Sequence, residues 1–152
     1  MASKGGNMNI PRMTVITLGV SDLARSTAFY REIFSTPPIT ENEGVTFIPL
    51  PGVWLSLYPL EKLAEDIGEA IKLPADGTFR GFTLAYNARS KDEITSIFKC
   101  VATAGAQISK APQDTFWGGY SGYFADPDGH YWEVAWGPMF DFTEHGDLRF
   151  KA

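Results

Sequence analysis

One short segment near the C-terminal end constrains the fold of this chain most strongly. Residues 123–136 read YFADPDGHYWEVAW, two runs rich in aromatic residues that are separated by the turn-forming residues 126–129. The proline fixes its own φ, the aspartates can accept hydrogen bonds from nearby backbone N–H groups, and the glycine tolerates positive φ. The segment therefore predicts a β-hairpin with strands at 120–125 and 131–136.

The second strand of this hairpin carries one carboxylate among apolar neighbours. Glu133 follows Trp132 and precedes Val134 and Ala135. A carboxylate in such surroundings needs a hydrogen-bonding partner, a metal ion or a shifted pKa. Two roles remain open for Glu133. It is either a general base that removes a proton next to a carbonyl group, or a structural group that accepts hydrogen bonds from Tyr, Trp or Arg side chains.

The same order of predicted elements occurs twice along the chain. The first copy has a strand at 14–20, a helix that begins after Ser21 or Asp22, and strands at 45–50 and 53–58. The second copy has a strand at 79–86, a helix that begins at the capping box 90–93 and ends before Gly105, and strands at 106–109, 120–125 and 131–136. A duplicated unit of this kind cannot bury its sheet alone. The sequence therefore predicts an α+β fold of two βαβββ repeats, each with a curved mixed sheet whose concave side must be covered.

These elements give a simple division of the chain. We expect a disordered leader or tag remnant at 1–12, a single domain at 13–138 and a C-terminal tail at 139–152. Within the domain, repeat one spans 13–59, repeat two spans 79–138, and the connector 60–78 contains a short amphipathic helix at 61–67.

Composition excludes several classes of partner. The 13 lysine and arginine residues are scattered and the formal net charge is −5, so we expect no nucleic-acid binding. The sequence contains no apolar run of the ~20 residues that a membrane span needs. Cys100 is the only cysteine and cannot form an intrachain disulfide, which favours a cytoplasmic location. We expect its side chain to be packed as a small apolar group rather than to be reactive.

Two segments carry a family resemblance. The hairpin at 123–136, together with the run VITLGVSDLARSTAFY at 15–30, resembles the vicinal oxygen chelate superfamily, which includes glyoxalase I, bleomycin-resistance proteins, fosfomycin-resistance enzymes and extradiol dioxygenases. The resemblance extends from about Met13 to Pro138. It implies a cup-like cavity, which in this superfamily is often completed within a homodimer.

The resemblance also implies four positions from which members hold one divalent metal ion. In this sequence they are Val15, then Leu55 or Ser56, then Gly81 or its neighbour Phe82, and finally Glu133. Only Glu133 has a side chain that ligates metals, and one carboxylate cannot hold a catalytic divalent ion. We therefore expect no complete metal centre and no cofactor.

Neither histidine is expected to rebuild that metal centre. Strand alternation sends His130 to the face opposite Glu133, where it is expected to be a turn residue. His145 lies in the polar tail and is expected to be exposed.

Aromatic residues near the predicted strands suggest a binding cavity. Trp54, Trp117, Tyr120 and Trp132 are the candidate ligand-binding residues, because flat rings in an apolar cavity suit a planar or hydrophobic molecule. Simple core packing is the alternative for each ring. The sequence thus favours a metal-independent protein that binds a small molecule in an aromatic-lined cavity. Two alternatives stay open: a lyase or isomerase that acts next to a carbonyl group through Glu133, and an interaction module whose cup is filled by a partner subunit.

Overall fold

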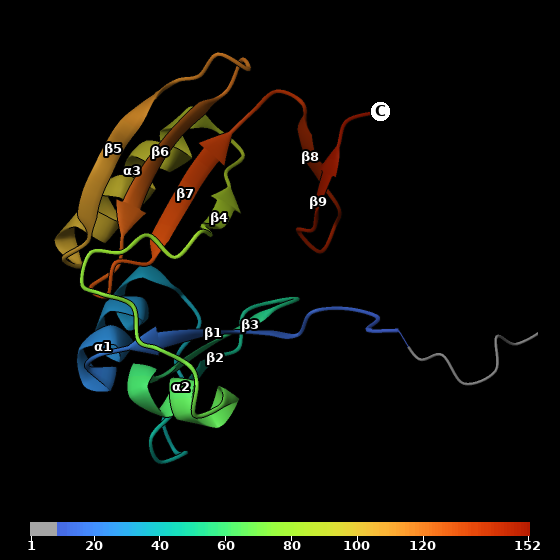
Figure 1. Ribbon diagram of the computed structural model, residues 1–152. Helices are drawn as coiled ribbons and strands as arrows, with labels where there is room; N and C mark the ends of the chain where they lie inside the picture. The colour runs from blue at the N-terminus through green and yellow to red at the C-terminus, as the bar shows by residue number, and fades with distance from the viewer. Residues whose placement is uncertain (1–8) are drawn as a thin grey trace, which may run out of the picture.

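The computed structural model describes residues 9–152, so most of the expected leader lies outside the described residues. Two units, each a sheet with a helix on one face, lie one above the other (Figure 1). The elements of the first unit are β1 (Val15–Val20), α1 (Leu23–Ile33), β2 (Thr46–Ile48), β3 (Trp54–Pro59) and α2 (Leu60–Ile67). Those of the second unit are β4 (Leu84–Asn87), α3 (Lys91–Thr103), β5 (Gln107–Asp114), β6 (Tyr120–Ala125) and β7 (Tyr131–Trp136). A final hairpin consists of β8 (Phe140–Phe142) and β9 (Leu148–Phe150).

The first sheet has the strand order β1-β3-β2, with β1 parallel to β3 and β2 antiparallel to it. Helix α1 begins at Asp22, whose side chain accepts a hydrogen bond from the backbone N–H of Arg25 at 3.0 Å, as its role of N-cap requires. The short helix α2 lies over one end of the opposite face of this sheet. Gly19 makes that contact possible, because a Cβ atom there would meet the Leu60 side chain at 2.5 Å.

The second sheet has the order β4-β7-β6-β5, with β4 parallel to β7 and the remaining pairs antiparallel. The capping box that the sequence predicts is confirmed in part. The Ser90 hydroxyl accepts a hydrogen bond from the backbone N–H of Glu93. The Glu93 carboxylate accepts from the backbone N–H of Arg89, whereas a capping box would use the N–H of the N-cap residue Ser90.

Three segments differ from the sequence prediction. Strand β4 covers Leu84–Asn87 and so begins later than the expected 79–86, since Gly81 has a φ of 82° and interrupts the extended backbone. Strand β5 is longer than expected and runs to Asp114. The segment after Pro138 contains the β8–β9 hairpin, in which Phe140 and Phe150 are cross-strand partners with stacked rings.

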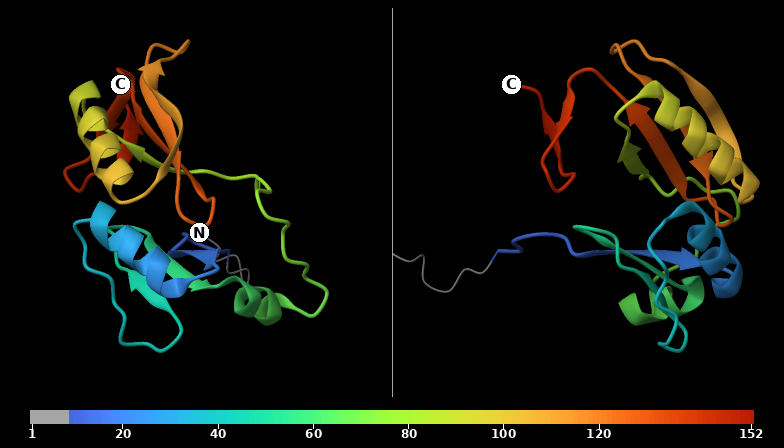
Figure 2. Two further views of the ribbon diagram at one scale, coloured as in Figure 1. Left: turned by 90° about the vertical axis from the view of Figure 1, so that its left-hand side faces the viewer. Right: turned by 180° about the vertical axis from the view of Figure 1, so that it is seen from behind.

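The helix-bearing faces of the two sheets share one hydrophobic core. Trp132 of β7 packs against Tyr30 of α1 and Phe34, the residue that follows α1, with ring centroids 6.2 and 5.7 Å apart, and stacks on Phe124 at 6.1 Å. Figure 2 shows α1 and α3 on the same side of the molecule, each against its own sheet. Both of these sheet faces also border a cleft of about 890 Å³ between the units, which Leu55, Leu84 and Trp132 help to line. We call the opposite face of each sheet its outer face; the outer faces of one chain therefore do not oppose each other.

Candidate functional site

The turn between β6 and β7 forms as the sequence predicts. Gly129 has a φ of 81°, and its N–H donates to the carbonyl oxygen of Asp126 at 3.0 Å. The Asp126 side chain accepts hydrogen bonds from the backbone N–H groups of Asp128 and His130, at 2.9 and 2.8 Å. These bonds close the turn without help from a ligand.

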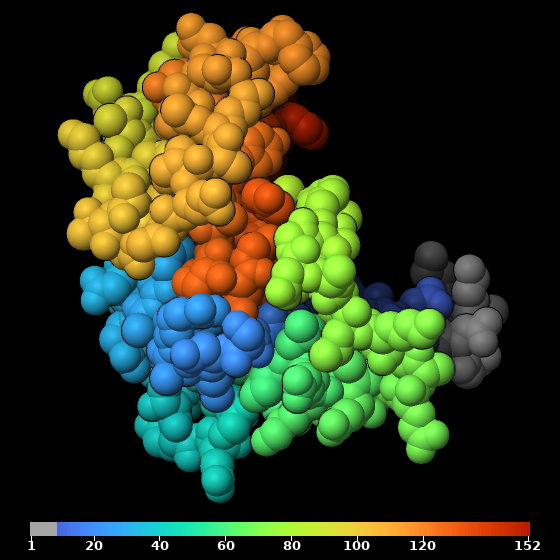
Figure 3. All heavy atoms as spheres, turned by 60° about the vertical axis from the view of Figure 1, so that its left-hand side comes forward, coloured from blue at the N-terminus to red at the C-terminus, as the bar shows by residue number. Residues whose placement is uncertain are grey.

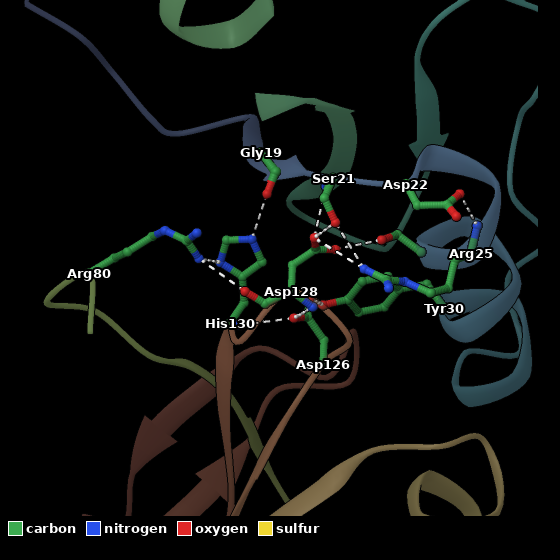
Figure 4. A network of polar contacts seen from close by, with 10 residues as sticks. Gly19, Ser21, Asp22, Arg25, Tyr30, Arg80, Asp126, Asp128 and His130 are labelled. Carbon is green, nitrogen blue, oxygen red and sulfur yellow. Dashed lines mark hydrogen bonds and ion pairs between the residues drawn. The ribbon is translucent and has the colours of Figure 1, made fainter. Parts of the chain in front are cut away.

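The same turn is fastened to the first unit by a network that we call the clasp (Figure 4). Asp128 accepts hydrogen bonds from the backbone N–H and hydroxyl of Ser21, at 2.8 and 2.9 Å, and from the hydroxyl of Ser26 at 2.7 Å. The Arg25 guanidinium lies 3.6 Å from the same carboxylate. Burial alone would raise the pKa of Asp128, but these hydrogen bonds and the arginine outweigh it, so the pKa is lowered.

A second part of the clasp is buried. The hydroxyl of Tyr30 donates to Asp126 at 2.6 Å and accepts from the indole N–H of Trp132 at 3.1 Å. Burial, reinforced by Asp126, raises the pKa of Tyr30 well above its usual value, so this phenol keeps its proton. Nε2 of His130 lies 2.9 Å from the carbonyl oxygen of Gly19 and therefore donates to it.

The clasp explains residues whose role the sequence left open. His130 is 5% exposed and belongs to the structural contact between the units, together with the two aspartates of the turn. The space-filling view shows the turn, in red-orange, between the blue start of α1 and the yellow-green connector (Figure 3). Nη1 of Arg80 donates to the carbonyl oxygen of Asp128 at 3.2 Å and adds the segment before β4 to this contact. The expected exposure of His145 is confirmed, whereas Cys100, expected to be packed, is exposed on α3.

Glu133 lies on the outer face of the second sheet, away from the clasp. Its neighbours Trp132 and Val134 point into the core, and Glu133 is half-buried on the opposite side of β7. Pairing places it opposite Tyr123 on β6 and opposite Ala85 on β4. A hydrogen bond to Glu133, aided by partial burial and the negative charge, raises the pKa of Tyr123.

Tyr123 is a residue of this site that the sequence reasoning missed. The signal was present, since pairing Ala125 with Tyr131 across the five residues 126–130 also sets Tyr123 opposite Glu133. The phenol donates and the carboxylate accepts, so the pair satisfies part of the hydrogen-bonding need that the apolar sequence context of Glu133 creates.

The outer face of the first sheet carries two of the other family positions, those at Val15 and Ser56. Val15 and Trp54 are cross-strand partners on β1 and β3, and each is 40% exposed. Ser56 shares this face, whereas Leu55 points into the core and is 3% exposed. The ring of Phe47 lies 6.0 Å from that of Trp54. Val15, Trp54 and Phe47 therefore form an apolar patch on this face, next to the hydroxyl groups of the partners Thr17 and Ser56.

The residues at the four family positions do not fit a divalent metal ion. Val15 and Gly81 have no ligating atom in their side chains, and Ser56 offers only a hydroxyl. Within residues 9–152, no group of three or more His, Cys, Asp or Glu side chains is close enough together to hold a metal ion. Glu133 instead lies opposite Tyr123, its cross-strand partner.

The four aromatic candidates do not share one surface. Trp54 lies on the outer face of the first sheet and also borders the cleft. Trp132 and Tyr120 lie on the helix-bearing face of the second sheet, where Trp132 is 8% exposed and the Lys91 ammonium lies 5.4 Å from the Tyr120 ring. Trp117, in the loop after β5, packs on Phe140 of β8 with centroids 6.3 Å apart.

Comparisons with known proteins agree with this fold. Residues 12–134 match the model of the Glyoxalase/Bleomycin resistance protein/Dioxygenase superfamily. The metallothiol transferase FosB of Shouchella clausii is 27% identical over 133 residues, which cover 86% of this chain and 83% of the relative. That of Lysinibacillus sphaericus is 25% identical over 138 residues, or 91% of each chain.

Solved structures give the same result. A glyoxalase-related enzyme from Fulvimarina pelagi superimposes with a TM-score of 0.81 and 32% identity, covering 94% of this chain and 100% of the other. A lactoylglutathione lyase from Agrobacterium tumefaciens has a TM-score of 0.65 at 21% identity, covering 89% of this chain and 100% of the other, and shows the fold alone. This chain thus belongs to the Glyoxalase/Bleomycin resistance protein/Dioxygenase superfamily.

Proposed function

We propose that this chain is a homodimeric, cytoplasmic binding protein for a small hydrophobic or planar molecule, and that it works without a complete metal centre. One observation carries the proposal: of the four positions from which the superfamily holds a metal, only Glu133 can ligate one, and it is paired with Tyr123. What remains at these positions is an apolar surface with a single carboxylate, which suits binding of an organic molecule better than Lewis-acid chemistry.

The homodimer is supported by the two outer faces and by unpaired strand edges. In the described residues, β1 pairs only with β3 and β4 pairs only with β7, so each has one free edge. A free edge presents unpaired backbone groups that another strand can satisfy. Since the outer faces of one chain do not oppose each other, a second copy is needed to set the Trp54 face against the Glu133 face. The cup then lies between subunits.

The aromatic residues support the class of ligand. Trp54 and Phe47 give the first outer face two neighbouring rings, and 40% of Trp54 is exposed in the isolated chain. Rings left uncovered on a sheet face bury apolar area when a flat molecule stacks on them. The cleft of about 890 Å³ between the units, which Trp132 borders, is the other apolar space in which a molecule of this class could bind.

Native mass spectrometry and metal analysis of the purified protein test this proposal. We expect twice the 16.8 kDa chain mass and no metal that stays bound through dialysis in a fixed ratio. A planar aromatic probe such as 1-anilinonaphthalene-8-sulfonate should bind saturably, and Trp54→Ala should weaken that binding. A stoichiometric metal ion that is lost in Glu133→Gln would contradict the proposal, and so would a monomer that binds no probe.

A second function is favoured by one observation. Glu133 and Tyr123 form a carboxylate and phenol pair on a half-buried surface, and such a pair can accept and donate protons next to a carbonyl group. A lyase or isomerase of this kind requires that Glu133→Gln abolish turnover and leave the fold intact. Turnover of an identified substrate at the parental rate in that variant would exclude it.

A further inference from the structure

The side chains that surround Glu133 on the outer face are of two kinds. Ala85 lies opposite it on β4, and Ala135 lies two residues further along β7. Tyr123 lies opposite on β6, and Tyr131 lies two residues back along β7. Cross-strand partners have Cβ atoms about 4.5–5.5 Å apart, so Ala85 and Tyr123 border the carboxylate directly. Ala135 and Tyr131 are its next neighbours on the same face of β7. Ala85 is exposed and leaves open space beside Glu133, whereas Ala135 is buried.

A third ring extends this group. Phe79, which precedes β4, meets Tyr131 edge to face with centroids 6.0 Å apart, and 61% of Phe79 is exposed. Tyr123 and Tyr131 are both half-buried. Two aromatic residues on the face of Glu133 are therefore followed by a third ring, Phe79, on a surface that is partly open to solvent in the single chain.

Rings and a carboxylate attract the same kind of ligand. The face of an aromatic ring is negative and draws in cations, most strongly where water is excluded. The Tyr123 hydroxyl occupies part of the hydrogen-bonding capacity of Glu133, and a carboxylate has about four lone-pair sites, so Glu133 can still meet a cationic group. The formal charge of the chain, −5, adds to this attraction.

One positive side chain lies in the same row. Lys110 of β5 is the partner of Tyr123 on the side away from Glu133, which places it two strands from the carboxylate. Neighbouring strands are about 4.8 Å apart, so the two backbones are separated by about 10 Å. The Lys110 side chain is exposed, and its long stem lets the ammonium group extend into water.

We propose that Glu133, Tyr123, Tyr131 and Phe79 form a subsite for an organic cation, a quaternary ammonium or protonated amine carried on an apolar or planar body. The inference rests on the proposed binding function and specifies the charge of its ligand. Glu133 pairs with the cationic group, the rings of Tyr123 and Tyr131 flank it with Phe79 beyond Tyr131, and the exposed side of Ala85 leaves the approach open.

Two probes of the same shape test this inference. Phenyltrimethylammonium carries the charge, and tert-butylbenzene is its neutral carbon counterpart. Binding of each to the full-length protein is followed by backbone amide NMR shifts, which also report whether the residues beside Glu133 are the ones affected. We expect the cation to bind about tenfold more tightly, and Glu133→Gln to remove that preference. Glu144→Gln, which removes one charge from the exposed β8–β9 turn, serves as the matched control and should leave the preference intact.

A second variant separates the rings from the charge. Tyr131→Leu keeps an apolar side chain and should weaken phenyltrimethylammonium binding while it leaves tert-butylbenzene binding unchanged. Equal affinity for both probes, unaffected by Glu133→Gln, would overturn the cation subsite and leave the proposed binding function standing. If neither these probes nor the anilinonaphthalene dye binds to the dimer, the proposed function itself is overturned.

Discussion

The hydroxyl of Tyr30 offers the most direct test of the clasp. Tyr30 is completely buried and its hydroxyl has two partners, Asp126 at 2.6 Å and the indole N–H of Trp132 at 3.1 Å. Tyr30→Phe removes one oxygen atom and leaves the ring packing in place. The Asp126 carboxylate then loses a donor, and the Trp132 N–H loses its acceptor in a site that is 8% exposed.

The expected cost follows from these two losses. A hydrogen bond to a charged group contributes about 1.5–3 kcal/mol, and a buried donor left without a partner costs about 1–3 kcal/mol. Part of this is recovered by relaxation, so we expect the free energy of unfolding to fall by about 3 kcal/mol. For a chain of this length, that corresponds to a decrease in Tm of roughly 6–12 °C.

Urea unfolding followed by tryptophan fluorescence, at one fixed protein concentration, measures this change. Tyr86→Phe is the matched control, because the Tyr86 hydroxyl bonds to Glu93 on a residue that is 44% exposed, and its loss should cost less than about 1 kcal/mol. If Tyr30→Phe were no more destabilising than Tyr86→Phe, the clasp would not be holding the two units together and this reasoning would be refuted.

Three further predictions concern charge, packing and the candidate site. The lowered pKa of Asp128 stabilises the fold above the unfolded-state pKa of this carboxyl, and that stability is lost as the pH falls through the folded-state pKa. Asp128→Asn should therefore make the decline of Tm in acid less steep. An unchanged dependence of Tm on pH would count against this. Gly122→Ala should lower the free energy of unfolding, measured by urea titration, by about 1–3 kcal/mol. A Cβ atom at this position would meet the Phe98 ring at 2.7 Å and backbone atoms at 2.8 and 2.9 Å. A substitution without effect would show that this packing is loose. Glu133→Gln should bring the pKa of Tyr123 down toward its ordinary value, measured by NMR of the phenol carbon, and no shift would mean that the two groups do not interact.

Local chemistry made much of the fold predictable. The turn at 126–129, the N-caps Asp22 and Ser90, and the end of α3 before Gly105, with its φ of 99°, each depend on residues close in sequence. The duplication was also visible, because each copy repeats the same order of strand and helix signals.

The candidate site was less predictable for physical reasons. Trp132 and Glu133 are adjacent in sequence and lie on opposite faces of one strand, and alternation alone does not say which face a helix covers. Trp132 is in the core because α1 of the other unit and the residue that follows it supply Tyr30 and Phe34 as its neighbours, a contact across about a hundred residues. The strand expected at 79–86 was overestimated since its apolar residues continue through Gly81, whose φ is positive.

The clasp also limits how this protein can move. The clasp connects α1 and Ser21, which lies just before it, to the turn at 126–129 of the second unit, through the carboxylates of Asp126 and Asp128. Swinging one unit against the other like a hinge would break several hydrogen bonds to these carboxylates, each at about 1.5–3 kcal/mol. The clasp therefore couples the two sheets, and a displacement of one sheet is expected to move the other with it as a single body.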